Sequence, residues 1–492
     1  MNGSQPSELP PGWAFAALGE VTESEVEQLA PHGSGDFTYV DISSVDNRAK
    51  GITQPKTLPV SEAPSRARQV LKAGDVLVSM TRPNLNAVAL VPTSLEGAVG
   101  STGFHVLRSK WMAPEWLYYL VQTAGFVDSM SKLVLGVLYP AVRPKDIRAF
   151  GAPVPPVGEQ RRIVAEVEKQ FTRLNAAVAA LGRVGANLKR YRASVLKAAC
   201  EGRLVPTEGE LARAEGREYE PADKLLSGKH ARASDVRRKR AGRLWGAGVV
   251  PELTADEREV LPKGWVWAKV RELGPDDPDD VVQVGPMSMR SSDFVEEGVP
   301  VLNVGCVGWG QFKEEKLDYL PAEKAASFLR YRIEPGDVLF TRSGTVGRCA
   351  VARTHQAGWL MTFHLLRARP EPGICLPEYL RIVFEGAAHI RRQTREASIG
   401  TTRAGFNTNL LAYLDVPLPP IAEQHRIVGE VERRLSVIDE LQAVVEADLR
   451  RAERLRQAIL KRAFEGRLVP QDPSDEPARV LLERIHNTQH ST

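Results

Sequence analysis

The side chains best suited to directed hydrogen bonding stand in polar loops of this chain. They are Arg82, Asn84, Asn86, Arg143, Arg342, Ser343, Thr345, Arg348, Thr402 and Arg403. Arg, Asn, Ser and Thr are the residues that hydrogen-bond to base edges and phosphates in nucleic acids. The same residues occur in any solvated loop. Their composition alone therefore leaves two interpretations open, a nucleic-acid contact surface and an ordinary polar surface.

Motifs for catalysis or nucleotide binding are not found in the sequence. It has neither a GxxxxGK[ST] phosphate loop nor the Asp/Asn-Pro-Pro-aromatic motif that adenine methyltransferases use. His105 and His364 both stand inside apolar runs, and a histidine in that setting is more often structural than catalytic. The four cysteines lack CxxC spacing, which argues against zinc and disulfide frameworks. We therefore expect no catalytic residue and no metal site in this chain.

The charge balance limits the ways in which the chain could bind a nucleic acid. With 65 Lys and Arg against 61 Asp and Glu, the net charge is only +4. This argues against a purely electrostatic binder but permits binding through local basic loops. No apolar run approaches the length of a membrane span, and the N-terminus lacks the apolar core of a signal peptide. We expect a cytoplasmic location.

An internal repeat must position the polar loops. Residues 153–206 align without a gap with residues 417–470, from PVPPVGEQRRIVAEVE against PLPPIAEQHRIVGEVE to EGRLVP in both copies. Ahead of each copy stands a related segment, LPPGW at 9–13 and LPKGW at 261–265. A long repeat period has to be interpreted as architecture before single residues are considered. The protein is therefore predicted to be two tandem copies of one unit.

Each copy of the repeat is predicted to form one long helix. Its apolar residues follow the 4/3 rhythm of a coiled-coil seam. The predicted seam is Val167, Phe171, Leu174, Val178, Leu181, Leu188 and Val195 in the first copy and Val431, Leu435, Ile438, Val445, Leu449, Ala452 and Ile459 in the second. Prolines precede each helix, and Gly202 and Gly466 follow as stop signals. A helix of about 43 residues would extend roughly 65 Å.

A narrow apolar stripe on so long a helix needs a partner. The stripe could pack on its own globular unit or on another chain. The preferred interpretation is that the two helices form an antiparallel coiled coil with each other. The two globular units would then stand at opposite ends, related by a pseudo-two-fold axis. The helices would act as a ruler between them.

The segments outside the repeated helices are predicted to be mixed α/β units. Three landmarks recur in both, Gly74–Val78 with Gly336–Phe340, Phe104–Arg108 with Phe363–Arg367, and Ala113–Leu117 with Leu376–Leu380. The first two are typical of strands and the third of a helix start. The predicted organisation is a first unit at 1–152, a helix at 153–206, a linker at 207–260, a second unit at 261–416, a helix at 417–470 and a tail at 471–492.

Two segments outside the units are described only by their composition. The linker carries a basic cluster at 229–243, which could be solvated surface or a phosphate or partner contact. The last residues, from His486 onward, are expected to be frayed.

Together these patterns resemble the specificity subunit of type I restriction-modification systems. The similarity rests on PxPPxxEQxRIVxEVE, a long helix and LKxAxEGRLVP, each occurring twice after domains that start with LPxGW. It covers nearly the whole chain. A shorter echo, Glu220–Leu226 against Glu476–Leu482, supports the duplicated design.

The resemblance implies a non-catalytic DNA-recognition subunit. In that family each target-recognition domain reads one half of a bipartite, asymmetric DNA site, and the helices fix the gap between the halves. The helices also dock two methyltransferase subunits, and ATP-dependent restriction subunits can join. S-adenosylmethionine, ATP and Mg²⁺ would be bound by those partners and not by this chain. The DNA-binding residues would be among the loop residues given above.

Two other interpretations remain. The same module could serve a restriction system whose partner fuses methylation and cleavage, which the neighbouring genes would distinguish. The chain could also be a coiled-coil adaptor without a nucleic-acid role. A DNA-binding assay with the methyltransferase present would test that interpretation.

Overall fold

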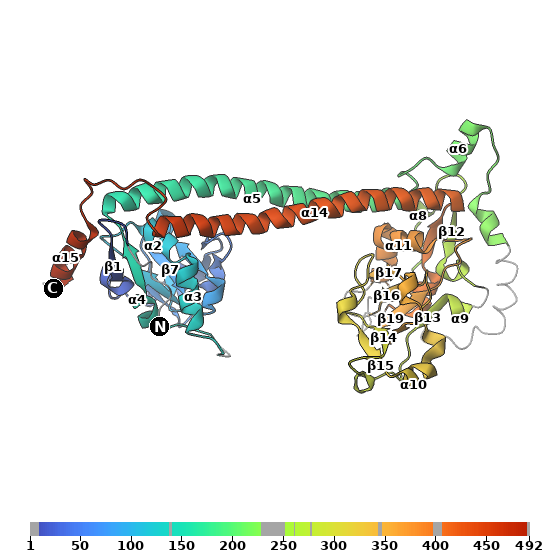
Figure 1. Ribbon diagram of the computed structural model, residues 1–492, viewed down its shortest axis with the longest axis horizontal. Coiled ribbons are helices and arrows are strands. Elements are labelled where there is room, and N and C mark those ends of the chain that lie inside the picture. Colours follow the sequence, from blue (N-terminus) through green and yellow to red (C-terminus); the bar gives the residue numbers. More distant parts are fainter. Residues whose placement is uncertain are drawn as a thin grey trace. The chain divides into compact units, whose positions relative to one another are not determined.

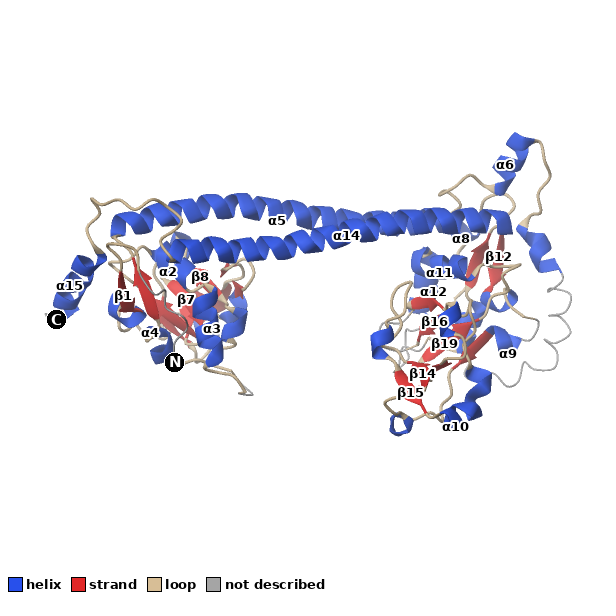
Figure 2. Cartoon of the chain, in the orientation of Figure 1, coloured by secondary structure: helices blue, strands red, loops and turns tan. Residues whose placement is uncertain are grey.

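The computed structural model describes residues 9–136, 140–227, 251–259, 261–275, 278–342, 347–396 and 406–489. The chain divides into two units (Figures 1 and 2). The first unit combines residues 1–183 with 445–492, and the second is the continuous stretch 184–444. Each unit therefore contains one half of each repeated helix. None of the helices within the described ranges is both long and apolar enough to cross a membrane.

The first unit is built from short strands with helices packed against them. Its strands are β1 (Ala14–Ala17), β2 (Asp36–Val40), β3 (Val45–Asp46), β4 (Gly51–Ile52), β5 (Lys56–Pro59), β6 (Ala67–Val70), β7 (Val76–Ser79), β8 (Val88–Leu90), β9 (Val99–Ser101), β10 (Phe104–Leu107) and β11 (Gly151–Val154). Its shorter helices are α1 (Leu18–Val21), α2 (Pro114–Leu120), α3 (Ala124–Lys132), α4 (Pro144–Arg148) and α15 (Ala478–Gln489). The strand orders are β5-β2-β9-β6, β10-β7-β8, β1-β11 and β3-β4.

The second unit follows the same plan. Its strands are β12 (Val266–Lys269), β13 (Val282–Val284), β14 (Val299–Leu302), β15 (Asp318–Leu320), β16 (Val338–Thr341), β17 (Cys349–Val351), β18 (Leu360–Met361), β19 (Leu365–Ala368) and β20 (Asp415–Leu418). Its shorter helices are α6 (Glu208–Glu215), α8 (Ala255–Glu259), α9 (Pro278–Val281), α10 (Ala322–Ala325), α11 (Pro377–Gly386), α12 (Ala388–Glu396) and α13 (Thr408–Tyr413). The strand orders are β13-β19-β16-β17, β15-β14-β18 and β12-β20.

The two repeated segments form the long helices α5 (Val157–Cys200) and α14 (Ile421–Phe464), each of 44 residues. Both begin directly after the Pro-Pro pair and end ahead of a glycine in the left-handed conformation, Gly202 (φ 63°) or Gly466 (φ 65°). The glycine lacks the Cβ that would oppose this turn. Each helix thus lies inside the segments 153–206 and 417–470, between the prolines and the glycine that the sequence marks as its start and stop signals.

Within each unit a half of α5 packs against a half of α14 in antiparallel directions. In the first unit, Arg456 of α14 lies over the Phe171 ring of α5, 4.2 Å from its centroid, and hydrogen-bonds to Asn175. In the second unit, Arg192 of α5 pairs with Asp439 of α14 at 2.6 Å. Arg192 aligns with Arg456 in the repeat, and Asn175 aligns with Asp439. The same polar contact thus occurs in both units. The paired antiparallel helices and the mixed α/β units confirm the predicted fold class.

The apolar stripe contacts both of the partners considered for it. Its buried members are Val167, Phe171, Val195, Val431, Leu435, Ile438, Val445 and Ile459, and its half-buried members are Leu174, Val178, Leu181, Leu188, Leu449 and Ala452. Val167 and Phe171 share a core with Trp116 of α2. Val431 and Leu435 share a core with the second unit's strands and α11. The outer ends of the stripe therefore enter the domain cores, and its middle serves the helix pair.

A tryptophan–glutamate hydrogen bond joins each globular part to the start of a long helix. Trp13 Nε1 donates to Glu159 Oε2 at 2.9 Å, and Trp265 Nε1 donates to Glu423 Oε1 at 2.9 Å. Both carboxylates are almost completely buried in the first turn of their helices, where the free N–H groups favour negative charge. This contact explains why LPxGW and PPxxEQ recur together in the sequence.

The neighbouring glutamine of each motif positions a second helix. The side-chain oxygen of Gln160 accepts from Ala113 N at 3.1 Å, and that of Gln424 accepts from Leu376 N at 2.8 Å. Ala113 and Leu376 are the residues just before α2 and α11, so each glutamine holds the start of a helix that begins with proline. The third sequence landmark is therefore confirmed at equivalent places.

The segment after each long helix returns to the LPxGW motif of the other copy. Ala478 N donates to Gly12 O at 2.8 Å in the first unit, and Ala222 N donates to Gly264 O at 3.0 Å in the second. Residues 471–489 are therefore not a free tail. The expectation of fraying from His486 is wrong for residues 486–489, which belong to α15, because the buried Ile485 holds this helix in the core.

A buried ion pair joins the central strands of each unit. Arg108 donates to both oxygens of Asp75 at 2.7 and 2.6 Å, and Arg369 donates to both oxygens of Asp337 at 2.6 and 2.8 Å. Both aspartates are buried. Bidentate geometry satisfies both charges away from water.

This ion pair corrects one of the predicted landmarks. The alignment of Phe104–Arg108 with Phe363–Arg367 is wrong by two residues. Leu107 pairs with Val76, and Ala368 pairs with Val338. Because Val76 and Val338 are equivalent, Leu107 corresponds to Ala368, and the segment equivalent to Phe104–Arg108 is 365–369. The second copy has an Arg at both 367 and 369. Phe363–Arg367 resembles Phe104–Arg108 in sequence, so the sequence alone aligns Arg367 with Arg108 in place of Arg369.

The two buried glutamates should respond differently to the same substitution. Glu423 Oε2 also accepts from Glu208 N at 2.8 Å, whereas Glu159 Oε1 has no partner among the described residues. Glu423→Gln places an amide donor against that N–H and should cost about 1–3 kcal/mol of unfolding free energy. Glu159→Gln keeps the acceptor for Trp13 and should cost less. Calorimetric unfolding of the full chain measures both, with exposed Glu440→Gln as the control.

The effect of each glutamine substitution on the unfolding free energy should change with pH in a definite direction. Burial raises the pKa of Glu159 and of Glu423 above the ordinary carboxyl value. Ionisation therefore opposes folding, and these groups lower stability as the pH rises above that ordinary value. Glu159→Gln should consequently be more favourable relative to the native chain at pH 7 than at pH 5. Equal losses for both glutamine variants at every pH would contradict this account.

Candidate nucleic-acid interface

In the first unit, Arg82, Asn84 and Asn86 lie in the loop between β7 and β8. Arg82 (φ 49°) and Asn86 (φ 47°) take left-handed backbone conformations on either side of a single turn of 3₁₀ helix, η3 (Pro83–Leu85). Asn tolerates this region, but Arg adopts it rarely and at an energetic cost. The loop therefore has a sharply curved backbone, and it leaves the side chains of Arg82 and Asn84 exposed.

The structure brings a second predicted loop to the same place. Arg82 N donates to Pro140 O at 2.9 Å, Val142 N donates to Met80 O at 2.9 Å, and Thr81 forms an isolated β-bridge with Ala141. Arg143 follows this bridge directly. Residues that are some 60 positions apart in sequence thus form one surface.

The two arginines of this surface differ in their freedom. Arg143 caps α4, and its guanidinium bonds to the Asp146 carboxylate at 3.1 Å. These bonds hold the pKa of Asp146 below its ordinary value. Arg82 makes no side-chain hydrogen bond or ion pair within the described part of the chain. Arg82 is therefore the donor most available to an external acceptor.

In the second unit, Arg342 and Arg348 flank the loop between β16 and β17. The guanidinium of Arg342 lies over the Phe363 ring, 4.2 Å from its centroid, and partial burial lowers its pKa from the ordinary value. Arg348 Nη2 donates to Val304 O at 3.4 Å. Ser343, Thr345, Thr402 and Arg403 lie outside the described residues, as does the basic cluster at 229–243.

A hairpin in each unit contacts these loops, and the sequence analysis missed it. In the first unit, β3 and β4 form the hairpin, and Lys50 Nζ donates to Asn86 O at 2.6 Å. Burial is the largest influence on Lys50 and lowers its pKa to about 8. The Tyr118 hydroxyl of α2 donates to Lys50 O at 2.7 Å and so holds the hairpin to α2. No local pattern in the sequence signals this contact.

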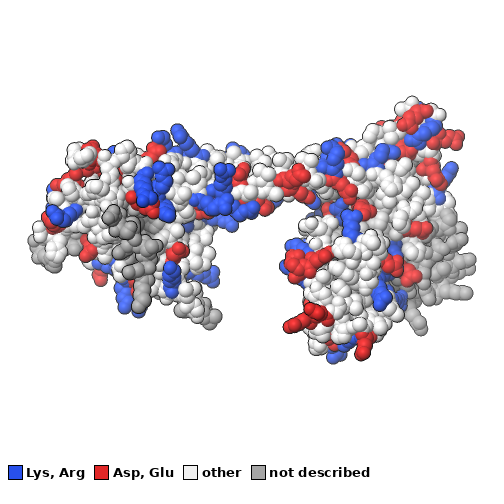
Figure 3. All heavy atoms as spheres, in the orientation of Figure 1, with Lys and Arg blue, Asp and Glu red and all other residues white. Residues whose placement is uncertain are grey.

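The exposed charge near this surface is mainly positive. Figure 3 shows Lys and Arg gathered on the first unit beside the long helices. The exposed cations of α14 in this unit are Arg450, Arg451, Arg454, Lys461 and Arg462. Glu453 and Arg456 of the same helix both act on Lys50. The loop, the hairpin and this part of α14 form a surface on which cationic and amide donors are available to anionic and carbonyl acceptors.

The two histidines do not occupy equivalent places. His105 lies within β10, where burial lowers its pKa to about 4 and leaves it neutral at pH 7. His364 precedes β19, and its carbonyl accepts from Arg342 N at 3.0 Å. In the first unit the carbonyl that accepts from Met80 N belongs to Gly103. The expectation that His105 and His364 stand at equivalent places in two strands is therefore wrong. The reason is the two-residue shift in the alignment of Phe104–Arg108 with Phe363–Arg367.

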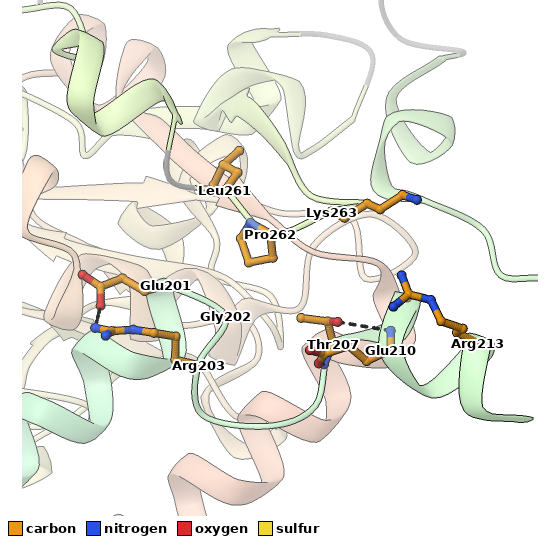
Figure 4. A pocket seen from close by; sticks show the side chains of 10 residues that line it. Glu201, Gly202, Arg203, Thr207, Glu210, Arg213, Leu261, Pro262 and Lys263 are labelled. Carbon is orange, nitrogen blue, oxygen red and sulfur yellow. Dashed lines mark hydrogen bonds and ion pairs between the residues drawn. The ribbon is translucent and has the colours of Figure 1, made fainter.

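A pocket of about 650 Å³ lies apart from the candidate loop residues, at the end of α5 (Figure 4). Its lining is Glu201, Gly202, Arg203, Thr207, Gly209, Glu210, Arg213, Leu261, Pro262 and Lys263. Thr207 and Glu210 bond to each other's backbone as the cap of α6. The lining combines the EGR and LPxGW motifs of the repeat, and its polar side chains serve the local structure.

Comparison with known proteins gives one consistent result. No family model matches the chain. The EcoKI specificity subunit of the type I restriction enzyme from Escherichia coli (strain K12) is 23% identical over 500 residues, covering 97% of this chain and 95% of the relative. The EcoBI specificity subunit from Escherichia coli is 25% identical over 373 residues, covering 73% and 69%. A chain in a solved structure of the type I R-M system is 27% identical with a TM-score of 0.67, covering 94% and 100%.

These matches span both units and the two helices that the sequence repeat defines. The duplicated LPxGW, PPxxEQ and EGRLVP motifs and their contacts account for the parts that the two copies share. Over nearly its whole length the chain is similar to the specificity subunits of type I restriction enzymes.

Proposed function

We propose that this chain reads DNA sequence for a type I restriction-modification complex and catalyses no step itself. Each unit reads one half of a bipartite, asymmetric site through its loops. The observation that carries the proposal is that one scaffold, repeated twice, presents loops at equivalent places with unlike residues. The first copy has Arg82 and Asn84 where the second has a different loop between Arg342 and Arg348.

Duplication within one chain explains why the two half-sites can differ. A symmetric dimer carries identical readers and therefore recognises a palindrome. Two covalently joined copies keep the repeated scaffold, while each can change its loops independently. The contacts that hold each copy together, such as Trp13 with Glu159, lie in the cores and not in the loops. Loop residues can therefore change with little effect on folding.

The helices α5 and α14 have two further roles in this proposal. They set the gap between the half-sites, and their outer faces dock two methyltransferase subunits, with ATP-dependent restriction subunits joining the complex. S-adenosylmethionine, ATP and Mg²⁺ belong to those partners. Mapping methylated adenines in cells with and without this gene tests the proposal. Methylation that stays the same without the gene, or that lacks a bipartite pattern, would refute it, and the adaptor interpretation would then be favoured.

Arg82→Ala tests direct reading of bases in the first unit. If Arg82 contacts a base, the substitution should cost roughly 1–3 kcal/mol of binding free energy and relax the preference at one position of one half-site. A phosphate contact would instead weaken binding to all sequences alike. Binding of the complex to a set of single-base variants of the mapped site measures this. Lys110→Ala, an exposed cation outside the candidate loops, is the control, and unchanged binding by Arg82→Ala would remove Arg82 from the interface.

An insertion into the helices tests the ruler. Four residues should be added to both helices, between Arg183 and Val184 and between Val444 and Val445, because these points separate the halves that pack within each unit. The added length of about 6 Å should widen the preferred gap by a base pair or two at about 3.4 Å each. Methylation mapping gives the gap directly. An active complex that keeps the original gap would contradict the ruler.

A further inference from the structure

The hairpins of the two units are built on equivalent anchors. In the first unit, Ser44 N donates to Asp41 O at 3.0 Å and Thr53 N donates to Ser44 O at 2.9 Å. In the second unit, Cys306 N donates to Asn303 O at 3.0 Å and Lys313 N donates to Cys306 O at 2.7 Å. The strand before each hairpin, β2 or β14, also pairs in parallel with the equivalent strand, β9 or β18.

The tips of the hairpins, in contrast, are unlike. The first hairpin spans Val45–Ile52 and carries Asn47, Arg48 and Lys50. The second pairs Val307 with Phe312 and turns through Trp309 and Gly310, with Gly308 N donating to Gln311 O at 2.9 Å. A fixed base with a variable tip is the arrangement that the recognition loops also show.

The second hairpin is held against the candidate loop of its own unit. Gly310 N donates to Cys349 O at 2.9 Å, directly after Arg348. Arg348 in turn donates to Val304 O, in the segment that leads into the hairpin. The hairpin therefore adjoins Arg348 and Cys349 at the described end of the β16–β17 loop, as Lys50 adjoins Asn86 in the first unit.

Trp309 is exposed on this turn, next to a tightly packed glycine. Gly310 has φ 76°, and a Cβ there would lie 3.1 Å from Arg381 Nη1 and 3.4 Å from Glu385 Oε1. Arg381 and Glu385 are ion-paired at 3.0 Å and buried beneath the turn. Trp309 is 51% exposed, and it is the only exposed tryptophan among the described residues.

We propose that Trp309 is a specificity-determining residue that lies in a groove of the DNA half-site read by the second unit. The inference rests on the proposed DNA-reading function. An indole offers a broad apolar face for sugar and base edges, including the thymine methyl group, and one N–H donor for a base acceptor. Arg348, beside it, supplies positive charge. The first unit places basic and amide side chains at the equivalent tip, so the two tips favour different base edges.

The test uses the full chain assembled with its methyltransferase subunits. Fluorescence anisotropy measures binding to three duplexes, the mapped site, the site with one half changed, and the site with the other half changed. Trp309→Ala should weaken binding to the intact site by about tenfold or more, because buried interface tryptophans carry a large share of binding energy. It should also reduce discrimination at one half-site only. Trp309→Phe should retain most of the affinity.

Leu329→Ala is the matched control, since Leu329 is another exposed apolar residue of this unit, at 57% exposure, and it should leave all three affinities unchanged. Unchanged affinity and discrimination in Trp309→Ala would overturn the inference. Loss of assembly with the methyltransferase would also overturn it, because Trp309 would then be a partner contact. If the complex of the native chain fails to discriminate between the duplexes, the proposed function itself fails.

Discussion

The indole N–H that a tryptophan donates to a buried glutamate holds each globular part to its long helix. Trp13 and Trp265 are the donors, and Glu159 and Glu423 are the acceptors. A buried carboxylate is unfavourable unless it is hydrogen-bonded, so replacing the tryptophan by phenylalanine would remove a donor that the carboxylate needs. The orientation of the first strand, of the helix and of α2 or α11 all depend on this point.

The shared scaffold separates folding from recognition. The contacts that close each unit recur at aligned positions, such as Arg108 with Asp75 and Arg369 with Asp337. The candidate loops and the hairpin tips differ between the copies, and many of their side chains are exposed and contribute little to the core. A change of a loop residue therefore alters what the surface can bind, while the cores that hold both units remain the same.

Much of the architecture could be predicted from the sequence because it depends on local periodicity. The 3.5-residue rhythm and the flanking Pro and Gly residues defined α5 and α14, and the repeat itself predicted two similar units. The strand register could not be predicted in the same way. From the sequence alone, Arg108 can be aligned with either Arg367 or Arg369. Only the pairing of Ala368 with Val338 distinguishes the two alignments.

The candidate site could be predicted only in part, because long-range contacts bring its residues together. Arg82 and Arg143 were recognised as loop residues, but their proximity depends on a bridge between Thr81 and Ala141 that no local pattern reveals. Lys50 and Trp309 were missed because each looks like an ordinary surface residue in the sequence. They become relevant only through long-range contacts of their hairpins with the loops at Asn86 and Arg348.

The return of α15 to the first unit affects how the protein can be made. Residues 184–444 form one continuous unit, whereas the first unit needs residues from both ends of the chain. The core around Trp13 includes Leu481 and Ile485, which leave the ribosome after residues 184–444. The second unit can therefore fold during synthesis, while the first must wait with apolar surface open to chaperones and proteases. A stop codon ahead of Ala478 would therefore remove part of the core around Trp13.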